Sequence, residues 1–283
     1  MANPAARERL RQHFLNAEES NHPIKWDELY REGFIPWDKG IPSAPLTEAL
    51  SRHDLISGPT AAESGTGKQR KRALVPGCGK GYDVLLLAAF GYDAYGLETS
   101  ELALKGARET EEKHGGDDVY RVRNEAVGRG KVTWITGDFF KDDWAKSLGE
   151  GFDGTFDVLF DYTFLSALPP TLRAAWSRRY SQLLAPTGRL ICLEFPTYKP
   201  INSGGPPWAL PPSVYMAHLP RPGKTLEYDD QGGIVEAKVG EPLSDGLVRI
   251  AHFQPQKTHA DGYDADGNMT DWVGVWAHPI IES

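Results

Sequence analysis

The stretch that decides the fold reads Ala73-Leu74-Val75-Pro76-Gly77-Cys78-Gly79-Lys80-Gly81-Tyr82-Asp83. Its apolar start, Ala73 to Val75, is typical of a buried parallel strand. Three alternating glycines follow, and the apolar segment from Asp83 to Phe90 is compatible with a helix. A strand, a glycine turn and a helix in this order form the nucleotide-binding half of a doubly wound α/β sheet. Glycine suits the turn because the backbone must bend sharply there and let a ligand approach closely.

The spacing of the glycines narrows the class of ligand. A dinucleotide-binding turn has the pattern G-x-G-x-x-G, whose last glycine packs the helix against the strand. Here Tyr82 stands at that place, and the third glycine comes one residue earlier. The next predicted strand, Asp93 to Leu97, is followed by Glu98, and an acidic residue about 20 positions after the turn is of the type that hydrogen-bonds ribose hydroxyls. The pattern favours an adenosyl group without phosphates and resembles that of S-adenosylmethionine (SAM) dependent methyltransferases, and a turn without a ligand stays open.

The composition argues against several classes of function. The chain has 283 residues, of which 40% are hydrophobic and 25% charged, as is ordinary for a soluble globular protein. It has no run of about 18 apolar residues, so we expect no membrane span, and its first ten residues do not predict a secretory signal. A net charge of −8, with only a short basic cluster at residues 68–72, argues against a nucleic-acid partner. Cys78 and Cys192 indicate no disulfide framework, so we expect a cytoplasmic protein.

The order of the apolar segments predicts the fold class. Five predicted strands alternate with helices and form successive βα units of a parallel sheet. The strands span residues 73–75, 93–97, 131–136, 156–161 and 189–195, and the helices between them span 83–90, 100–114 and 172–184. Two later segments, Leu247–Phe253 and Trp272–Ala277, alternate in polarity like an antiparallel pair of strands. We therefore predict an α/β, Rossmann-like fold with a seven-stranded, mostly parallel sheet and helices on both faces.

We expect one domain over residues 1–283, made of five successive parts. They are an N-terminal helical lid (1–55), a mobile loop (57–71), a cofactor-binding core (72–195), a substrate-side insertion (196–246) and closing antiparallel strands (247–283). The lid is predicted because Phe34 and Trp37 lie in a loop rich in proline and glycine and need other elements to pack against. The insertion is predicted because residues 196–223 contain eight prolines, too many for a strand.

Five short stretches together resemble one family. They are Phe34-Ile35-Pro36-Trp37-Asp38-Lys39-Gly40, Ala73-Leu74-Val75-Pro76-Gly77-Cys78-Gly79, Gly96-Leu97-Glu98-Thr99-Ser100, Phe160-Asp161-Tyr162-Thr163-Phe164 and Gly204-Gly205-Pro206-Pro207. From Trp26 to Pro207 the chain is similar to the thiopurine/thiocyanate S-methyltransferase superfamily of class I SAM-dependent methyltransferases. Within it, the chain is most similar to fungal thiol methyltransferases such as the gliotoxin bis-thiomethyltransferases. Its 115–130 insertion and long C-terminal region depart from the plant halide/thiocyanate members, which leaves the methyl acceptor open.

The resemblance implies a set of residues that contact SAM. Glu98 would accept both ribose hydroxyls, and Asp138, at a strand end, would accept the adenine amino group, with a surface carboxylate and a turn cap as the respective alternatives. The indoles of Trp26 and Trp37 would bind the methionyl part, or else pack in a core together with Tyr30. The predicted cofactor-binding residues are Trp26, Trp37, Gly77, Gly79, Glu98, Thr99, Asp138, Phe139 and Tyr162.

These features predict a SAM-dependent S-methyltransferase that acts on a small-molecule thiol, of the gliotoxin dithiol type. A thiol has a pKa near 8.5, so about a few per cent is thiolate at neutral pH and no strong base is required. We assign no catalytic residue, no metal site and no partner subunit. Three alternatives stay open: another small acceptor (halide, thiocyanate, oxygen or nitrogen), a NAD-dependent oxidoreductase, and a SAM-binding scaffold without catalysis.

Overall fold

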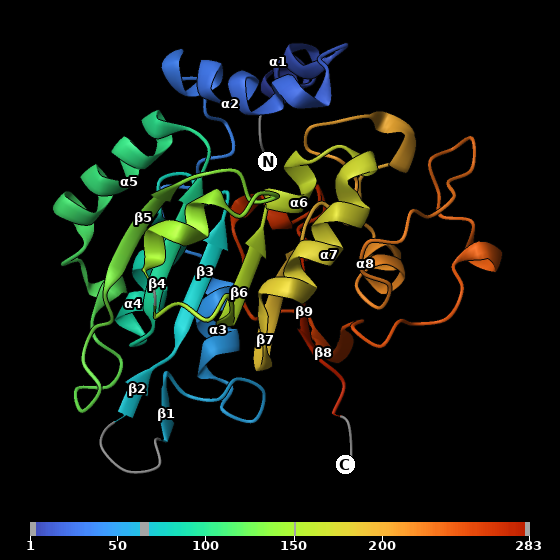
Figure 1. The fold of residues 1–283 in the computed structure, drawn as a ribbon. Coiled ribbons are helices and arrows are strands. Elements are labelled where there is room, and N and C mark those ends of the chain that lie inside the picture. The colour runs from blue at the N-terminus through green and yellow to red at the C-terminus, as the bar shows by residue number, and fades with distance from the viewer. Residues whose placement is uncertain (1–3, 63–67, 150, 281–283) are drawn as a thin grey trace.

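A seven-stranded sheet runs through the computed structural model, which describes residues 4–62, 68–149 and 151–280 (Figure 1). The strand order is β5-β4-β3-β6-β7-β9-β8. The strands are β3 (Arg72–Pro76), β4 (Asp93–Glu98), β5 (Val132–Thr136), β6 (Phe156–Tyr162), β7 (Leu184–Glu194), β8 (Val248–Phe253) and β9 (Trp272–Ala277). Strands β3 to β7 are parallel, and β9 pairs antiparallel with both β7 and β8. The predicted Rossmann-like fold is confirmed.

Helices cover both faces of this sheet, and each face has its own apolar core. The helices are α3 (Ala44–Ser51), α4 (Tyr82–Ala89), α5 (Glu101–His114), α6 (Phe164–Ala167), α7 (Arg173–Leu183) and α8 (Pro212–His218). On one face, Leu46 of α3 and Leu86 of α4 belong to the same core as Val75 of β3. On the other face, Trp176 of α7 belongs to the same core as Leu74. Successive residues of β3 point to opposite cores, which is why the predicted strand is apolar at each position.

The carboxyl ends of the parallel strands form one edge, where the strand order changes direction. From β3 the chain moves outward to β4 and β5, whereas β6 and β7 lie on the other side of β3. Ligands of open α/β sheets bind in the crevice outside such a switch point. Gly77 follows β3, Glu98 is the last residue of β4, and Asp138 lies just after β5. The sheet therefore brings these three predicted cofactor residues to one edge.

Helices α1 (Pro4–Phe14) and α2 (His22–Arg31) lie over this edge (Figure 1). Their apolar side chains form a small core that is separate from the two sheet cores. Its members are Leu10, Phe14 and Leu29, with Trp26, Phe34 and Trp37 packed against them. We call residues 4–43 the lid segment. Its aromatic residues pack among themselves because the short helices and their loop bury them jointly.

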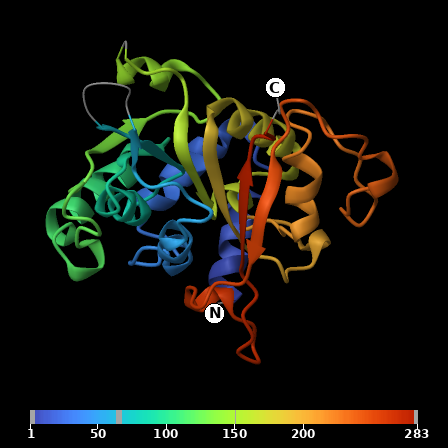
Figure 2. The ribbon, with the colours of Figure 1, turned by 90° about the horizontal axis from the view of Figure 1, so that it is seen from below.

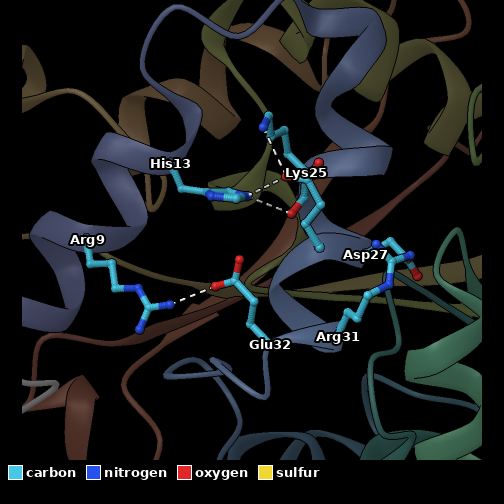
Figure 3. Close-up of polar contacts among 7 residues, drawn as sticks. Arg9, His13, Lys25, Asp27, Arg31 and Glu32 are labelled. Atoms are coloured by element: carbon cyan, nitrogen blue, oxygen red, sulfur yellow. Dashed lines mark hydrogen bonds and ion pairs between the residues drawn. The ribbon is translucent and has the colours of Figure 1, made fainter.

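Polar contacts join α1 to α2 at the surface of the lid segment (Figure 3). A guanidinium nitrogen of Arg9 donates to Glu32 at 2.7 Å, and His13 Nε2 lies 3.0 Å from the backbone oxygen of Lys25. The side chains of Arg9 and Glu32 are 55% and 49% exposed, and an exposed pair of this kind contributes about 0–1 kcal/mol. The aromatic core, more than these contacts, therefore holds the two helices together.

The lid segment ends earlier in the chain than the predicted lid. Residues 1–55 were expected to form it, but α3 packs into the core of the sheet, where Leu46 and Ala49 are fully buried. Ser43 caps α3 through its hydroxyl, which accepts the N–H of Leu46 at 3.3 Å. Its own N–H donates to Asp83 of α4 at 2.7 Å. The apolar face of α3 explains the difference, because burying it needs the sheet and not the cofactor site.

The expected mobile loop at residues 57–71 contains regular structure at both ends. Strands β1 (Thr60–Ala62) and β2 (Lys68–Arg70) pair antiparallel, and residues 63–67 lie outside the described part of the chain. The Arg70 guanidinium donates to the carbonyl oxygens of Gly91 at 2.8 Å and of Gly128 at 3.2 Å. Contacts with residues far along the chain therefore order the base of this segment, and local composition does not reveal them.

The predicted substrate-side insertion divides into two parts. Residues 196–207 follow β7 at the carboxyl edge, whereas the rest contains α8, which begins at a proline as helices readily do. Figures 1 and 2 show the chain around η6 (Glu236–Lys238) extending outward past α8, away from the middle of the sheet. Only the first part of the insertion therefore lies near the crevice where a ligand is expected.

Candidate active site

A cavity of about 620 Å³ lies between the carboxyl edge of the sheet and the lid segment. Its volume is within the range of about 300–1,000 Å³ that small-molecule sites occupy. The strand ends and turns contribute Gly77, Glu98, Thr99, Asp138 and Phe139, and the lid segment contributes Leu10, Trp26, Tyr30, Trp37 and Lys39. Further walls are Thr163, Phe164, Leu168, Leu172, Phe195, Pro206, Pro207 and Asp261. Seven of the nine predicted cofactor residues thus line one cavity.

The glycine turn approaches the cavity through Gly77. Its φ of +58° is in the left-handed region that favours glycine, and a Cβ there would lie 2.5 Å from the ring of Phe164. Gly79 does not line the cavity; its backbone N–H donates to Glu98 at 3.2 Å. One glycine therefore makes room at the cavity wall, and the other orients the acidic side chain that reaches that wall.

Glu98 is 9% exposed, and backbone groups fix its orientation. One carboxylate oxygen accepts the N–H groups of Thr99 at 2.7 Å and Ser100 at 3.1 Å, and the other accepts Gly79. Burial raises the pKa of the carboxyl, while these N–H groups favour the charged form and oppose the shift. The arrangement presents an oriented hydrogen-bond acceptor to the cavity.

Asp138 both caps a turn and lines the cavity. One carboxylate oxygen accepts the N–H of Phe140 at 3.0 Å, and the other lies 3.4 Å from the ammonium of Lys141. The adjacent Phe139 is buried with its ring 5.2 Å from that of Phe164. The turn-cap alternative for Asp138 thus describes part of its role, and the side chain still reaches the site.

The two tryptophans belong to the core of the lid segment and also line the cavity. The rings of Trp26 and Trp37 pack edge to face at 4.9 Å within the small core of the lid segment, and both line the cavity. The indole N–H of Trp37 donates to the hydroxyl of Tyr30 at 3.3 Å. The aromatic core of the lid segment is therefore also one wall of the cavity.

The structure does not bring Tyr162 to the cavity wall. Its ring stacks on His259 at 5.5 Å with an interplanar angle of 5°, and its buried hydroxyl has no hydrogen-bond partner among the described residues. Burial raises the pKa of Tyr162 well above its usual range. The preceding Asp161 points to the opposite face, where it accepts the indole N–H of Trp176 at 2.8 Å and the hydroxyl of Tyr180 at 3.0 Å. Neither residue is placed as a base.

Sequence reasoning missed the polar pair Lys39 and Asp261. Their side chains form an ion pair, are 16% and 10% exposed, and both line the cavity. Lys39 lies within the quoted loop motif, but Asp261 is 222 residues away and follows no recognisable pattern. Arg173, by contrast, is 3% exposed and donates to the carbonyl of Ala209 at 3.0 Å, so it faces neither cavity nor solvent.

The part of the chain that the structure describes contains neither a metal site nor a membrane-spanning helix. No three His, Cys, Asp or Glu residues there lie close enough to hold a metal ion. No helix there is both long enough and apolar enough to cross a membrane. The histidines near the sheet instead contact neighbouring side chains, as when His252 Nε2 lies 3.1 Å from a Glu194 oxygen.

The sheet order, the glycine turn and the acidic residue at the end of the second strand form the ligand-binding crevice of a Rossmann-like fold. The model of the family "Thiopurine S-methyltransferase (TPMT)" matches residues 21–232, and the chain belongs to this family. It is 32% identical over 191 residues to "Probable thiol methyltransferase 2" of Arabidopsis thaliana, covering 67% of this chain and 69% of the relative. It is 31% identical over 190 residues to "Thiocyanate methyltransferase 1" of Brassica oleracea, with the same shares.

Solved structures show the same fold at low sequence identity. The Burkholderia thailandensis 1,6-didemethyltoxoflavin-N1-methyltransferase, solved with S-adenosylhomocysteine, superposes with a TM-score of 0.55 at 12% identity, covering 93% of this chain and 92% of its own. A structure titled "Conversion of a Disulfide Bond into a Thioacetal Group during Echinomycin Biosynthesis" has a TM-score of 0.50 at 18% identity, covering 89% and 90%. This chain is therefore an enzyme that uses SAM to methylate sulfur in small molecules.

Proposed function

We propose that SAM occupies the cavity with its adenosyl part at the strand ends and its methionyl part under the lid segment. Glu98 would accept the ribose hydroxyls, and Asp138, Phe139 and Thr99 would hold the adenine. The residues fit this group, because Gly77 lets the turn reach the cavity wall at a place where a Cβ would collide with the Phe164 ring, and Glu98 is an oriented acceptor. Gly79 would act on the cofactor through its N–H, which orients Glu98.

The methionyl end would lie against aromatic side chains of the lid segment. Trp26 and Trp37 line the cavity beside Gly77. An indole face attracts a cation such as a sulfonium, and an exposed indole N–H donates to a carboxylate. When bound, SAM supplies an activated methyl group, which a thiolate displaces in line to leave S-adenosylhomocysteine. The chain's own tasks are to hold the two reactants in register and to exclude water.

The acceptor that fits best is a bulky, apolar thiol, and we propose a dithiol metabolite of the gliotoxin type. Many of the walls beyond the glycine turn are apolar, namely Phe164, Leu168, Leu172, Pro206 and Pro207, and Lys39 and Asp261 add a polar pair. Thiocyanate, which names one relative, would leave most of these walls without contact. The volume of about 620 Å³ supports a site for SAM together with an acceptor of several rings.

Tyr162 and His259, which stack on each other, do not line the cavity, and we propose a reaction in which neither acts as a base. Burial raises the pKa of Tyr162 far above neutrality, so its phenol stays protonated. Burial lowers the pKa of His259 to about 4, so its ring is neutral at pH 7, but it stacks on Tyr162 and does not line the cavity. The substrate's own ionisation therefore supplies the nucleophile, and the unpaired thiols of Cys78 and Cys192 fit the predicted cytoplasmic setting.

The test is the pH dependence of methyl transfer across thiols of different pKa. We expect kcat/KM to rise with pH and its inflection to follow the pKa of each thiol. Thiocyanate is the control, because it is already an anion and its kcat/KM should not change over the same pH range. A matched alcohol and amine should react far more slowly, because without a base the alcohol keeps its proton and is a weak nucleophile, and the amine is protonated at neutral pH and has no free lone pair. An inflection that stays at one pH for every thiol would identify an enzyme base and contradict this mechanism. Product analysis on a cyclic dithiol tests the proposed acceptor.

A further inference from the structure

Three successive residues of the lid segment point in three directions. Trp37 lines the cavity, Asp38 lies 2.6 Å from the ammonium of Lys80 in the glycine turn, and Lys39 pairs with Asp261. We call residues 33–43, which follow α2, the lid loop. The loop is thereby attached to the cofactor turn on one side and to the chain between β8 and β9 on the other.

The Asp261 side of this attachment is held firmly. Asp261 lies in η7 (Ala260–Gly262), just after His259, whose ring stacks on Tyr162 of β6. The N–H of Thr270 donates to the carbonyl of Gly262 at 2.8 Å. A Cβ on Gly262 would lie 2.1 Å from a carboxylate oxygen of Asp271, so the turn packs closely against the start of β9. Asp261 is therefore fixed relative to β6 and β9.

The burial of the pair distinguishes it from the surface contacts of the lid segment. The side chains of Lys39 and Asp261 are 16% and 10% exposed, compared with 55% and 49% for Arg9 and Glu32. Screening by salt is weaker for buried charges, and removing one partner leaves the other charge buried without compensation. Other ionisable groups that interact with the pair are Asp271, the neutral His259 and Tyr162. The pair therefore links two segments that lie 222 residues apart in the sequence.

We propose that Lys39 and Asp261 are positioning residues for methyl transfer: their ion pair holds the lid loop over the acceptor end of the cavity. Through the loop it keeps Trp37 in place and keeps water out. The inference rests on the proposed function for the placement of SAM against Trp37. It requires no contact between the pair and the reacting atoms.

The experiment compares three variants with the wild-type protein: Lys39→Met, Asp261→Asn and the double variant. Each single variant should lower kcat/KM about tenfold or more. The kcat/KM of the double variant should not fall below that of the less active single variant, because the effects of two residues of one pair are not additive. Hydrogen exchange of the protein without SAM gives a second readout. The amides of Asp38 and Gly40, bonded within the loop at 3.0 and 2.9 Å, should exchange faster in all three variants.

The matched control is Lys238→Met, which breaks the exposed pair with Glu227 far from the cavity and should change neither readout. Losses that add in the double variant would overturn the proposal, as would unchanged exchange of the loop amides. An inactive Lys39→Met beside a fully active Asp261→Asn would show that Lys39 acts on a ligand directly, which also overturns it. The SAM affinity of Glu98→Ala separates the two ideas: if it falls as expected while the pair variants behave like wild type, only the present inference fails.

Discussion

The cavity has a proposed cofactor end and a proposed acceptor end, which are built in different ways. At the cofactor end, Gly77, Glu98 and Asp138 come directly at the ends of neighbouring strands. At the acceptor end, Lys39 comes from the lid loop and Asp261 from the C-terminal region, and they meet across 222 residues. Sheet pairing, such as Pro76 with Leu97, sets the first geometry, whereas packing among separate segments sets the second.

This difference indicates how strongly each end of the cavity should respond to the substitution of a single side chain. Backbone hydrogen bonds hold β3 and β4 on both sides and the edge strand β5 on one side, so the position of these strand ends hardly depends on any one side chain. The acceptor end depends on a few side-chain contacts between segments that are otherwise separate. We therefore expect changes in the lid segment to affect methyl transfer more than cofactor binding, and changes at the strand ends to do the reverse.

The largest effect should follow from removing the lid segment. A variant that begins at Pro42 keeps Ser43, and with it the cap of α3 and the bond to Asp83. Because the apolar core of α1 and α2 is separate from the sheet cores, circular dichroism should show the sheet intact. Methyl transfer should fall at least about 1,000-fold, a loss of about 4 kcal/mol in transition-state stabilisation. Weak SAM binding should stay measurable. Methyl transfer at the wild-type rate would show that the lid segment does not cover the reacting groups.

A smaller effect, confined to the cofactor end, is expected from Glu98→Ala. The substitution removes an acceptor of two proposed charge-assisted hydrogen bonds, each worth about 1.5–3 kcal/mol, so SAM affinity should fall at least tenfold. Glu98→Gln is the milder variant: it keeps the shape, but it loses the charge and replaces one acceptor oxygen with an NH2 donor. Its SAM affinity should lie between those of the wild type and Glu98→Ala. Calorimetry measures the affinity, while kcat at saturating SAM should stay near the wild-type value. An unchanged affinity would remove Glu98 from the site.

The smallest effect concerns the strand beneath the acceptor end. Glu194, at the end of β7, is fully buried, and burial raises its pKa to about 8. Its folded pKa lies above the unfolded value, so its stabilising contribution is complete below about pH 4.5 and is lost as pH rises through about 8. Between about pH 5 and pH 8, the free energy of unfolding should fall by at least about 1 kcal/mol more in the wild type than in Glu194→Gln. Urea unfolding at several pH values measures this, and parallel pH curves for both proteins would refute it.

Much of the core was predictable because its signals are local. The apolar runs of the strands, the alternating glycines and Ser100, whose hydroxyl accepts the N–H of Ala103 at 3.2 Å, each act over a few neighbouring residues. The prediction missed α6, α8 and the pairing of β1 with β2, which depend on tertiary contacts. Arg70 is an example, because its three carbonyl partners lie 21 to 58 residues further along the chain.

The sequence by itself determined the class of fold, the glycine turn and the acidic residue at the second strand end, because strand alternation and turn geometry are properties of short segments. Only the tertiary structure decided which of two successive residues faces which core: Asp161 turns to α7, and Tyr162 turns to His259. It also decided that Lys39 meets Asp261. The physical reason is that such contacts arise only when distant segments close on each other, and no periodicity in the chain records the residues that will then be neighbours.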